Sequence, residues 1–199
     1  YFTGLANYTK ILSYKVANET GLGEVSDLIS AFSDLLQNAT RYHVICALLS
    51  VGTMENGVKA INRVIDDVIE EGIFVVIASG NFGIKSSNPL NHLAINKRAI
   101  VVGAINDKDQ VASYSSMGKN VGNNVIKPDI VAPGGSDLSG HRNLISVGHN
   151  NNEITAGRGT SISAAIVAST INLLIEAKWG SWTNWYSNNP QLYVKILKA

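Results

Sequence analysis

A serine in a glycine-rich segment just before an apolar stretch is the first candidate for chemistry in this sequence. Residues 157–168 read GRGTSISAAIVA, and Ser161 lies where the small residues give way to the apolar run. A helix amino terminus has unpaired N–H groups and a positive partial charge. There, Ser161 would attack a carbonyl while its own N–H binds the developing oxyanion. Serine is also a preferred helix cap, and the segment taken alone favours the cap.

Asn81 is the second candidate, in the segment SGNFG over residues 79–83 at the end of a predicted strand. Its side-chain amide would donate a second hydrogen bond to an oxyanion. Asparagine in a glycine-rich loop is also ordinary turn chemistry. Neither Ser161 nor Asn81 is sufficient alone, but the two together favour a nucleophilic site over a helix cap.

The segments that would position these two residues alternate between predicted strands and helices. Hydrophobic periodicity predicts four strands, at Lys10–Val16, Val44–Leu49, Ile73–Ala78 and Ala99–Ala104. It predicts three helices: one at Ser26–Asn38, one from Val58 to a stop at Gly72, and one from Ser161 to Ala177. A hairpin is predicted from Leu144–Val147 with Ile154–Ala156. Strands that alternate with helices predict parallel crossovers. The sequence therefore predicts the α/β class, with a doubly wound, mostly parallel sheet and helices on both faces.

The other reactive side chains favour structural roles. An acidic cluster on the second helix predicts a solvated helix face rather than a metal site; its members are Asp66, Asp67, Glu70 and Glu71. The single cysteine, Cys46, stands in an apolar run and predicts a buried strand thiol. His43 opens a predicted strand, His92 lies in a loop, and His141 and His149 flank the hairpin, so each is assigned to structure or surface.

Composition narrows the classes of function. The chain of 199 residues suits one domain, and its net charge of +1 without a basic tract argues against a dedicated nucleic-acid binder. Its longest apolar runs are too short to span a bilayer, which predicts no membrane span. Three glycosylation sequons, at Asn7, Asn18 and Asn38, favour an exported protein.

Ligands of open α/β sheets bind at the carboxyl ends of the strands, which directs attention to three loops. These are residues 50–52, 79–83 and 132–134, each containing glycine, which lets a substrate backbone approach closely. The segment Gly21–Gly23 does not continue as a dinucleotide-binding fingerprint. The nucleophile elbow of another serine esterase fold, G-x-S-x-G, is also missing around Ser161.

Taken in order, these motifs resemble the subtilisin-like serine proteases, or subtilases. Residues 159–165, GTSISAA, resemble the nucleophile motif of that family, and residues 75–83, VVIASGNFG, resemble the strand and loop that present its oxyanion asparagine. Further segments occur in the order of the family, at residues 10–16, 49–52, 101–104, 112–118 and 127–134. The resemblance spans nearly the whole chain.

The resemblance implies a role for each candidate residue. Ser161 would be the nucleophile and Asn81 the oxyanion donor. Ser50, Val51 and Gly52 would offer backbone to an extended polypeptide substrate, and Ala78, Ser79 and Gly80 would wall the pocket for the residue before the cut bond. The chemistry would need no cofactor, although the resemblance makes structural calcium possible. The location would be extracellular or at the cell surface.

The sequence departs from the family most at the catalytic triad. Subtilases order it Asp, His, Ser, and their Asp and His motifs precede the segment that corresponds to Gly4–Val16, where this chain has neither. We therefore expect residues 1–199 to form a single incomplete catalytic domain without its amino-terminal part. An amino-terminal segment of the same protease, on the same precursor or a separate chain, would supply Asp and His. The alternative is an inactive subtilase-like structural or binding module.

Overall fold

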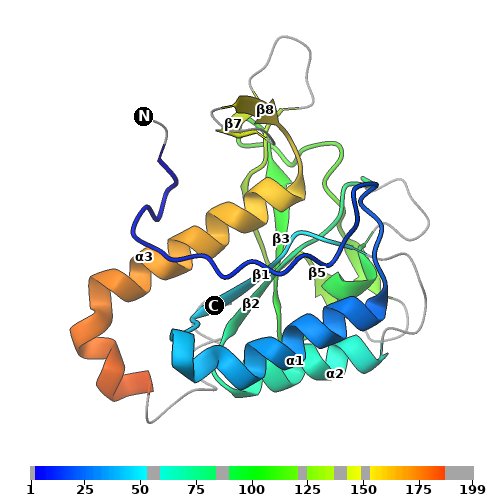
Figure 1. Ribbon diagram of the computed structural model, residues 1–199. Helices are drawn as coiled ribbons and strands as arrows, with labels where there is room; N and C mark the ends of the chain where they lie inside the picture. Colours follow the sequence, from blue (N-terminus) through cyan, green and yellow to red (C-terminus); the bar gives the residue numbers. More distant parts are fainter. Residues whose placement is uncertain are drawn as a thin grey trace.

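A four-stranded parallel sheet lies at the centre of the structure, in the order β1-β2-β3-β6 (Figure 1). The computed structural model describes residues 3–52, 59–83, 90–120, 125–136, 143–148 and 153–186. The sheet strands are β1 (Cys46–Leu49), β2 (Phe74–Ala78), β3 (Ile100–Ile105) and β6 (Ile130–Pro133). All three pairings are parallel, which confirms the predicted sheet.

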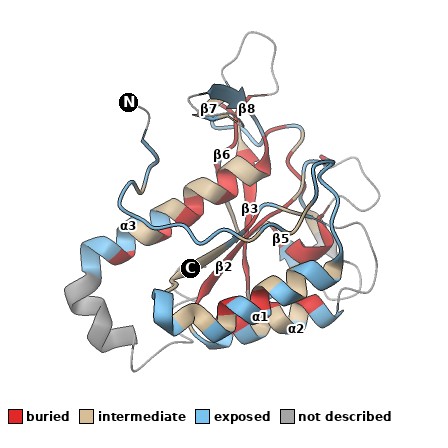
Figure 2. Cartoon of the chain, viewed as in Figure 1, coloured by how far each residue is buried: buried red, intermediate tan, exposed pale blue. Residues whose placement is uncertain are grey.

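Helices cover both faces of this sheet. The helices α1 (Val25–Tyr42) and α2 (Lys59–Glu70) pack on one face, and α3 (Thr160–Tyr186) crosses the other (Figure 1). Every residue of β2 is buried because successive side chains enter opposite layers (Figure 2). Val75 and Ile77 join the apolar cluster under α1 and α2, whereas Phe74, Val76 and Ala78 join the cluster under α3.

The apolar helix α3 is the core helix of its layer. Over Thr160–Lys178 it is long and apolar enough to cross a membrane, judged by length and composition alone. It packs instead along β1, β2, β3 and β6, through the buried face of Ala164, Val167, Ala168, Ile171 and Ile175. The sheet therefore accounts for the apolar composition of this helix.

The prediction of a strand at Lys10–Val16 is wrong. These residues are irregular and mostly exposed, because no strand in the described part of the chain lies beside them to complete a hydrogen-bonded ladder. One side chain holds the segment in place: the Tyr14 hydroxyl donates to Asp34 Oδ2 of α1 at 2.7 Å. Burial, followed by the Asp34 carboxylate, raises the pKa of Tyr14 to about 12.

The helix α1 continues beyond its predicted end at Asn38 and stops at Tyr42. His43 then adopts a left-handed conformation (φ 50°) and its N–H donates to the carbonyls of Ala39 and Thr40. The prediction that His43 opens a core strand is therefore wrong, since it caps a helix and β1 begins only at Cys46. At the other helix, Gly72 has φ 84° just after α2, as its predicted role as a stop requires.

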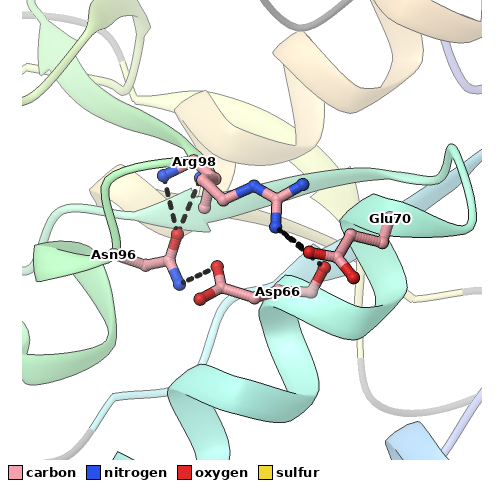
Figure 3. Close-up of polar contacts among 5 residues, drawn as sticks. Asp66, Glu70, Asn96 and Arg98 are labelled. Carbon is pink, nitrogen blue, oxygen red and sulfur yellow. Dashed lines mark hydrogen bonds and ion pairs between the residues drawn. The ribbon is translucent and has the colours of Figure 1, made fainter. Parts of the chain in front are cut away.

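The acidic cluster of α2 is only partly a solvated face (Figure 3). Asp67 and Glu71 are exposed, but Asp66 Oδ1 accepts from Asn96 Nδ2 at 3.1 Å and Glu70 Oε1 accepts from Arg98 Nη1 at 2.7 Å. Asn96 Oδ1 in turn accepts the backbone N–H groups of Arg98 and Ala99. These contacts fix the chain between the short helix η1 (His92–Ile95) and β3 against α2.

Two antiparallel ribbons complete the described elements. The predicted hairpin is confirmed as β7 (Leu144–Val147) paired with β8 (Ile154–Gly157), whereas β4 (Gly118–Asn120) paired with β5 (Val125–Lys127) was not predicted. At the end of β5, the buried Lys127 Nζ donates to Ala99 O at 3.0 Å and to Asp129 Oδ2 at 2.7 Å. Asp129 Oδ2 also accepts from Val101 N, which ties β3 to the start of β6.

The thiol of Cys46 is expected to be inert in the native protein. Cys46 packs against the apolar cluster under α3, and burial raises the pKa of its thiol to about 12. Since the thiolate is the reactive form, alkylation at pH 8 should be slower than for an exposed thiol by on the order of 10³-fold. Peptide mapping after iodoacetamide treatment checks this, with the guanidinium-unfolded protein as the control that reacts fully. Native alkylation at the unfolded rate would contradict it.

Candidate active site

Ser161 lies at the start of α3, where that helix meets the carboxyl end of β1. Two reciprocal hydrogen bonds join it to Ser50, the residue that follows β1. Ser161 Oγ donates to Ser50 O at 3.3 Å, and Ser50 Oγ donates to Ser161 O at 3.3 Å. Ser161 is half-buried and Ser50 is exposed, so the Ser161 hydroxyl lies at the surface of the sheet's carboxyl edge. The structure thus brings together two residues that are 111 positions apart.

Asn81 and Thr160 are joined by side-chain and backbone contacts just before Ser161. Asn81 Oδ1 accepts from Thr160 N at 2.9 Å and from Thr160 Oγ1 at 3.0 Å. Thr160 Oγ1 also accepts from Gly80 N at 3.2 Å. Asn81 therefore caps α3 from the loop after β2, and it supplies an acceptor that the helix's first N–H groups otherwise lack.

Glycine is required at the residue before Thr160. Gly159 has φ 151°, which other residues rarely adopt, and a Cβ there would lie 3.3 Å from Asn81 Nδ2. The N–H of Gly159 donates to Gly134 O at 2.8 Å, which ties the entry to α3 to the loop after β6. The glycine-rich segment thus lets Asn81 approach the helix start closely.

Two N–H donors at the entry to α3 have no partner among the described residues. With its oxygen held by Thr160, Asn81 presents Nδ2 on an exposed side chain, and this nitrogen has no hydrogen-bond partner in the described part of the chain. The backbone N–H of Ser161, in the first turn of α3, is also unpaired among the residues described. N–H groups of these two kinds are the donors that stabilise an oxyanion when they point at its oxygen.

Asn91 links the two loops predicted to receive a substrate, and sequence reasoning missed it. Its buried amide Nδ2 donates to Val51 O at 3.1 Å and to Ala78 O at 3.2 Å. Gly52 lies so close that a Cβ there would be 3.0 Å from the Asn91 amide. Asn91 Oδ1 accepts from Leu93 N and so caps η1, and that capping position is the only local signal the sequence offered.

The other predicted substrate-binding residues lie on the same edge with different exposure. Ala78 and Ser79 are buried, and Gly80 is half-buried with φ 112°. The backbone N–H and carbonyl of Ser79 are both used, by Val102 O and Asn91 N, and its hydroxyl has no partner among the described residues. The backbone of Gly80 is used as well, since its N–H donates to Thr160 Oγ1 and its carbonyl accepts from Ser116 N.

The third predicted loop, residues 132–134, supports the site from behind. Ala132 and Pro133 belong to β6, and their carbonyls accept the hydroxyl of the buried Ser163 at 3.0 and 3.2 Å. The Tyr114 hydroxyl donates to the next two carbonyls, Gly134 O at 2.6 Å and Gly135 O at 2.9 Å. This loop is held by the start of α3 and by Tyr114.

A base for Ser161 is not among the described residues. The Ser161 hydroxyl bonds to Ser50 O, and in the described part of the chain no histidine reaches it. His43 caps α1 on the opposite face of the sheet, His92 is buried in η1, and His141 and His149 lie outside the described residues. The described ranges also hold no group of three His, Cys, Asp or Glu side chains able to bind a metal ion.

The three sequons differ in their surroundings. Asn7 and Asn18 are exposed, and Asn18 Oδ1 accepts from Thr20 N and Thr20 Oγ1 within its own sequon. Asn38 lies inside α1, half-buried, with Nδ2 donating to both the backbone and the side chain of Asp34. The amide nitrogens of Asn7 and Asn18 are therefore more open to solvent than that of Asn38.

Comparison with known proteins places these observations in one family. Residues 1–189 match the subtilase family, peptidase S8. The chain is 31% identical over 182 residues to subtilisin NAT of Bacillus subtilis subsp. natto, covering 91% of this chain and 42% of that protein. It is 29% identical over 177 residues to a cuticle-degrading serine protease of Arthrobotrys oligospora, covering 89% of this chain and 39% of that protein.

A solved structure agrees with the fold. Sphericase superposes with a TM-score of 0.67 at 23% identity, over 92% of this chain and 56% of that one. The chain spans about two fifths of the length of the two curated relatives above. The parallel sheet agrees with the family match, and the chain belongs to the subtilase family.

Proposed function

We propose that this chain is the carboxyl-terminal part of one subtilisin-like catalytic domain that hydrolyses peptide bonds. It would supply the nucleophile and the oxyanion donors, while Asp and His come from a segment outside it. The observation that carries the proposal is the junction at the start of α3. There Asn81 Oδ1 accepts from Thr160 N and Thr160 Oγ1, which holds the Asn81 side chain against the helix end that carries Ser161.

In the proposed reaction, Ser161 Oγ attacks the carbonyl carbon of the substrate and its proton passes to the imidazole of the outside segment. The carbonyl oxygen becomes an oxyanion that accepts from Ser161 N–H and Asn81 Nδ2. Collapse of the intermediate breaks the C–N bond, and the imidazole returns the proton to the leaving amine. Water then hydrolyses the acyl-enzyme by the same route, and no step needs a cofactor.

The free edge of β1 supports the proposal that a segment completes the site. Among the described strands β1 pairs only with β2, so its other edge has no neighbour. Leu48 on this strand is 43% exposed, more than an apolar side chain would be if a further strand lay beside β1. A further strand added in parallel to β1 would end at the same edge of the sheet as Ser50. Side chains beyond its end would then come close to the Ser161 hydroxyl.

The substrate is a polypeptide in this proposal. The backbone of Ser50, Val51 and Gly52 would pair with the residues before the cut bond, and Ala78, Ser79 and Gly80 would lie beside the last of them. Asn91 would keep these two loops at a fixed separation through its bonds to Val51 O and Ala78 O. An extracellular or cell-surface location is part of the same proposal, supported by the exposed sequons at Asn7 and Asn18.

A serine-reactive fluorophosphonate probe tests the proposal. Labelling of Ser161 is expected to be fast in the protein completed by the segment with Asp and His, and slow in this chain alone, because the hydroxyl is a weak nucleophile without its base. Mass spectrometry of the labelled peptide distinguishes Ser161 from the buried Ser163. Cleavage of a general protein substrate by the completed protein is measured in parallel.

The matched control is Ser33→Ala, which removes an exposed hydroxyl whose bond stays within α1. Labelling should be lost in Ser161→Ala and kept in Ser33→Ala. A completed, folded protein that neither reacts with the probe nor cleaves protein would reject the protease. That result would favour the alternative, an inactive subtilase-like binding module.

A further inference from the structure

Arg158 is the charged residue in the described segments that form the proposed site. Five described segments form or support the site around the Ser161 hydroxyl: residues 50–52, 78–83, 113–116, 134–136 and 157–163. Arg158 is the only charged residue in these five segments. Arg158 is exposed and stands three positions before Ser161. An extended chain advances at most about 3.6 Å per residue, so the two Cα atoms lie within roughly 11 Å of each other.

Two weak contacts direct the Arg158 guanidinium without neutralising it. Its Cζ lies 6.0 Å from the centre of the Tyr114 ring, and its Nη1 donates to Ser136 O at 3.4 Å. Neither partner is a carboxylate, and no ion pair joins Arg158 to the described part of the chain. Within the described ranges, most N–H groups of this side chain therefore have no partner, and they lie on a planar fork suited to a carboxylate.

The Tyr114 ring that Arg158 contacts belongs to a residue that also bonds to the loops of the site. Tyr114 O accepts from Gly83 N at 2.8 Å, on the loop that carries Asn81, while the Tyr114 hydroxyl donates to Gly134 O and Gly135 O. A Cβ added at Gly135 would lie 2.9 Å from Arg158 Cβ, so this loop and Arg158 are in close contact. The guanidinium is thus supported by segments that also fix the nucleophile and the oxyanion donor.

The order of strands decides which part of a substrate meets Arg158. Ser50–Gly52 follow β1 and Gly134–Ser136 follow β6, at opposite ends of the four-stranded sheet. Three strand spacings separate these ends by about 14 Å, the length of about four extended residues. Ser161 bonds on the β1 side, whereas Arg158 contacts the loop on the β6 side. If the residues before the cut bond lie along Ser50–Gly52, those after it must lie toward Arg158.

We infer that Arg158 makes this protease select an acidic residue, Asp or Glu, at the first or second position after the cut bond. The inference rests on the proposed protease function and adds its substrate preference. A substrate carboxylate would pair with the guanidinium in a charge-assisted, bidentate contact. Because the site is open to solvent, the expected preference over the neutral amide is modest, roughly 3- to 10-fold in kcat/KM.

The test uses the completed protein and peptides that differ only after the cut bond. Each peptide carries Asp, Glu, Asn, Gln or Lys at the first or second such position, and kcat/KM is measured by chromatography of the products. Wild type should cut the Asp and Glu peptides roughly 3- to 10-fold faster than their Asn and Gln counterparts. The ratio should fall as salt is raised, since an exposed ion pair is screened.

Variants separate the charge of Arg158 from its packing. Arg158→Gln should bring the Asp/Asn ratio close to one, and Arg158→Glu should favour the Lys peptide. Arg63→Gln, which removes an exposed arginine of α2, should leave the ratio as in wild type. Equal cleavage of the acidic and neutral peptides by wild type would reject the acidic preference but leave the proposed protease function intact. Failure to cut any peptide rejects the protease itself, and the preference falls with it.

Discussion

Replacement of Ser161 by alanine is expected to lower the kcat of the completed protease by roughly 10⁶-fold, the size known for the nucleophile of subtilisin itself rather than a value derived for this chain. The variant keeps the two oxyanion donors and the substrate-binding backbone, so some activity above the uncatalysed rate should remain. KM should change little, because the proposed contacts that bind the substrate come from the backbone of Ser50–Gly52 and not from the Ser161 hydroxyl. Single-turnover and steady-state assays on one peptide measure both quantities.

The same variant should fold as the wild type does. Its lost hydrogen bond joins a half-buried hydroxyl to the carbonyl of an exposed residue, and such a bond contributes about 1 kcal/mol at most. Denaturant unfolding followed by circular dichroism checks this. Two outcomes would argue against Ser161 as the nucleophile. One is a Ser161→Ala protein that still turns over at near the wild-type rate, and the other is a loss of activity that is matched by loss of structure.

The sequence predicted the sheet because its signals are local. Each buried strand is a short apolar run, and the Gly159 and Gly80 positions need backbone conformations that few other residues adopt. Such requirements are visible in the sequence before any contact is known. Ser161 and Asn81 became candidates for the same reason, since each lies in a glycine-rich turn next to an apolar segment.

Contacts between distant segments were beyond sequence reasoning. Asn91 holds Val51 and Ala78 together, yet it stands in a stretch whose pattern matches no motif. Asp66 and Glu70 looked like solvent-facing acids on an amphipathic helix, but Asn96 and Arg98 reach them from another part of the chain. Nothing in the spacing of a single helix shows which of its polar residues a remote loop will contact.

The segment Lys10–Val16 shows a second limit of pattern. Its alternation and its β-branched and aromatic residues are those of a strand, but a strand also needs a neighbour to receive its backbone hydrogen bonds. No described strand lies beside it, so the segment remains irregular and is attached through the bond of Tyr14 to Asp34. β-propensity predicts the ability to pair, and the available partner decides whether pairing occurs.

The second large effect is expected at Asn81. Asn81→Ala should lower kcat by about 10²–10³-fold, a size known from the oxyanion asparagine of subtilisin itself, which corresponds to about 2.7–4 kcal/mol. Here the loss has two parts, since alanine removes both the donor Nδ2 and the acceptor Oδ1 that caps Thr160 N. The alanine variant alone therefore does not separate transition-state stabilisation from a loosened start of α3.

Asn81→Asp makes that separation. Its retained oxygen can still accept from Thr160 N and Thr160 Oγ1, and a carboxylate near a helix amino terminus favours the helix. The other oxygen, however, replaces the donor by an acceptor that repels an oxyanion. If Asn81 stabilises the transition state, kcat should fall in Asn81→Asp at least as far as in Asn81→Ala, while thermal stability stays at or above that of the alanine variant. If Asn81 only caps the helix, Asn81→Asp should be nearly as active as wild type, and the oxyanion role would have to be given up.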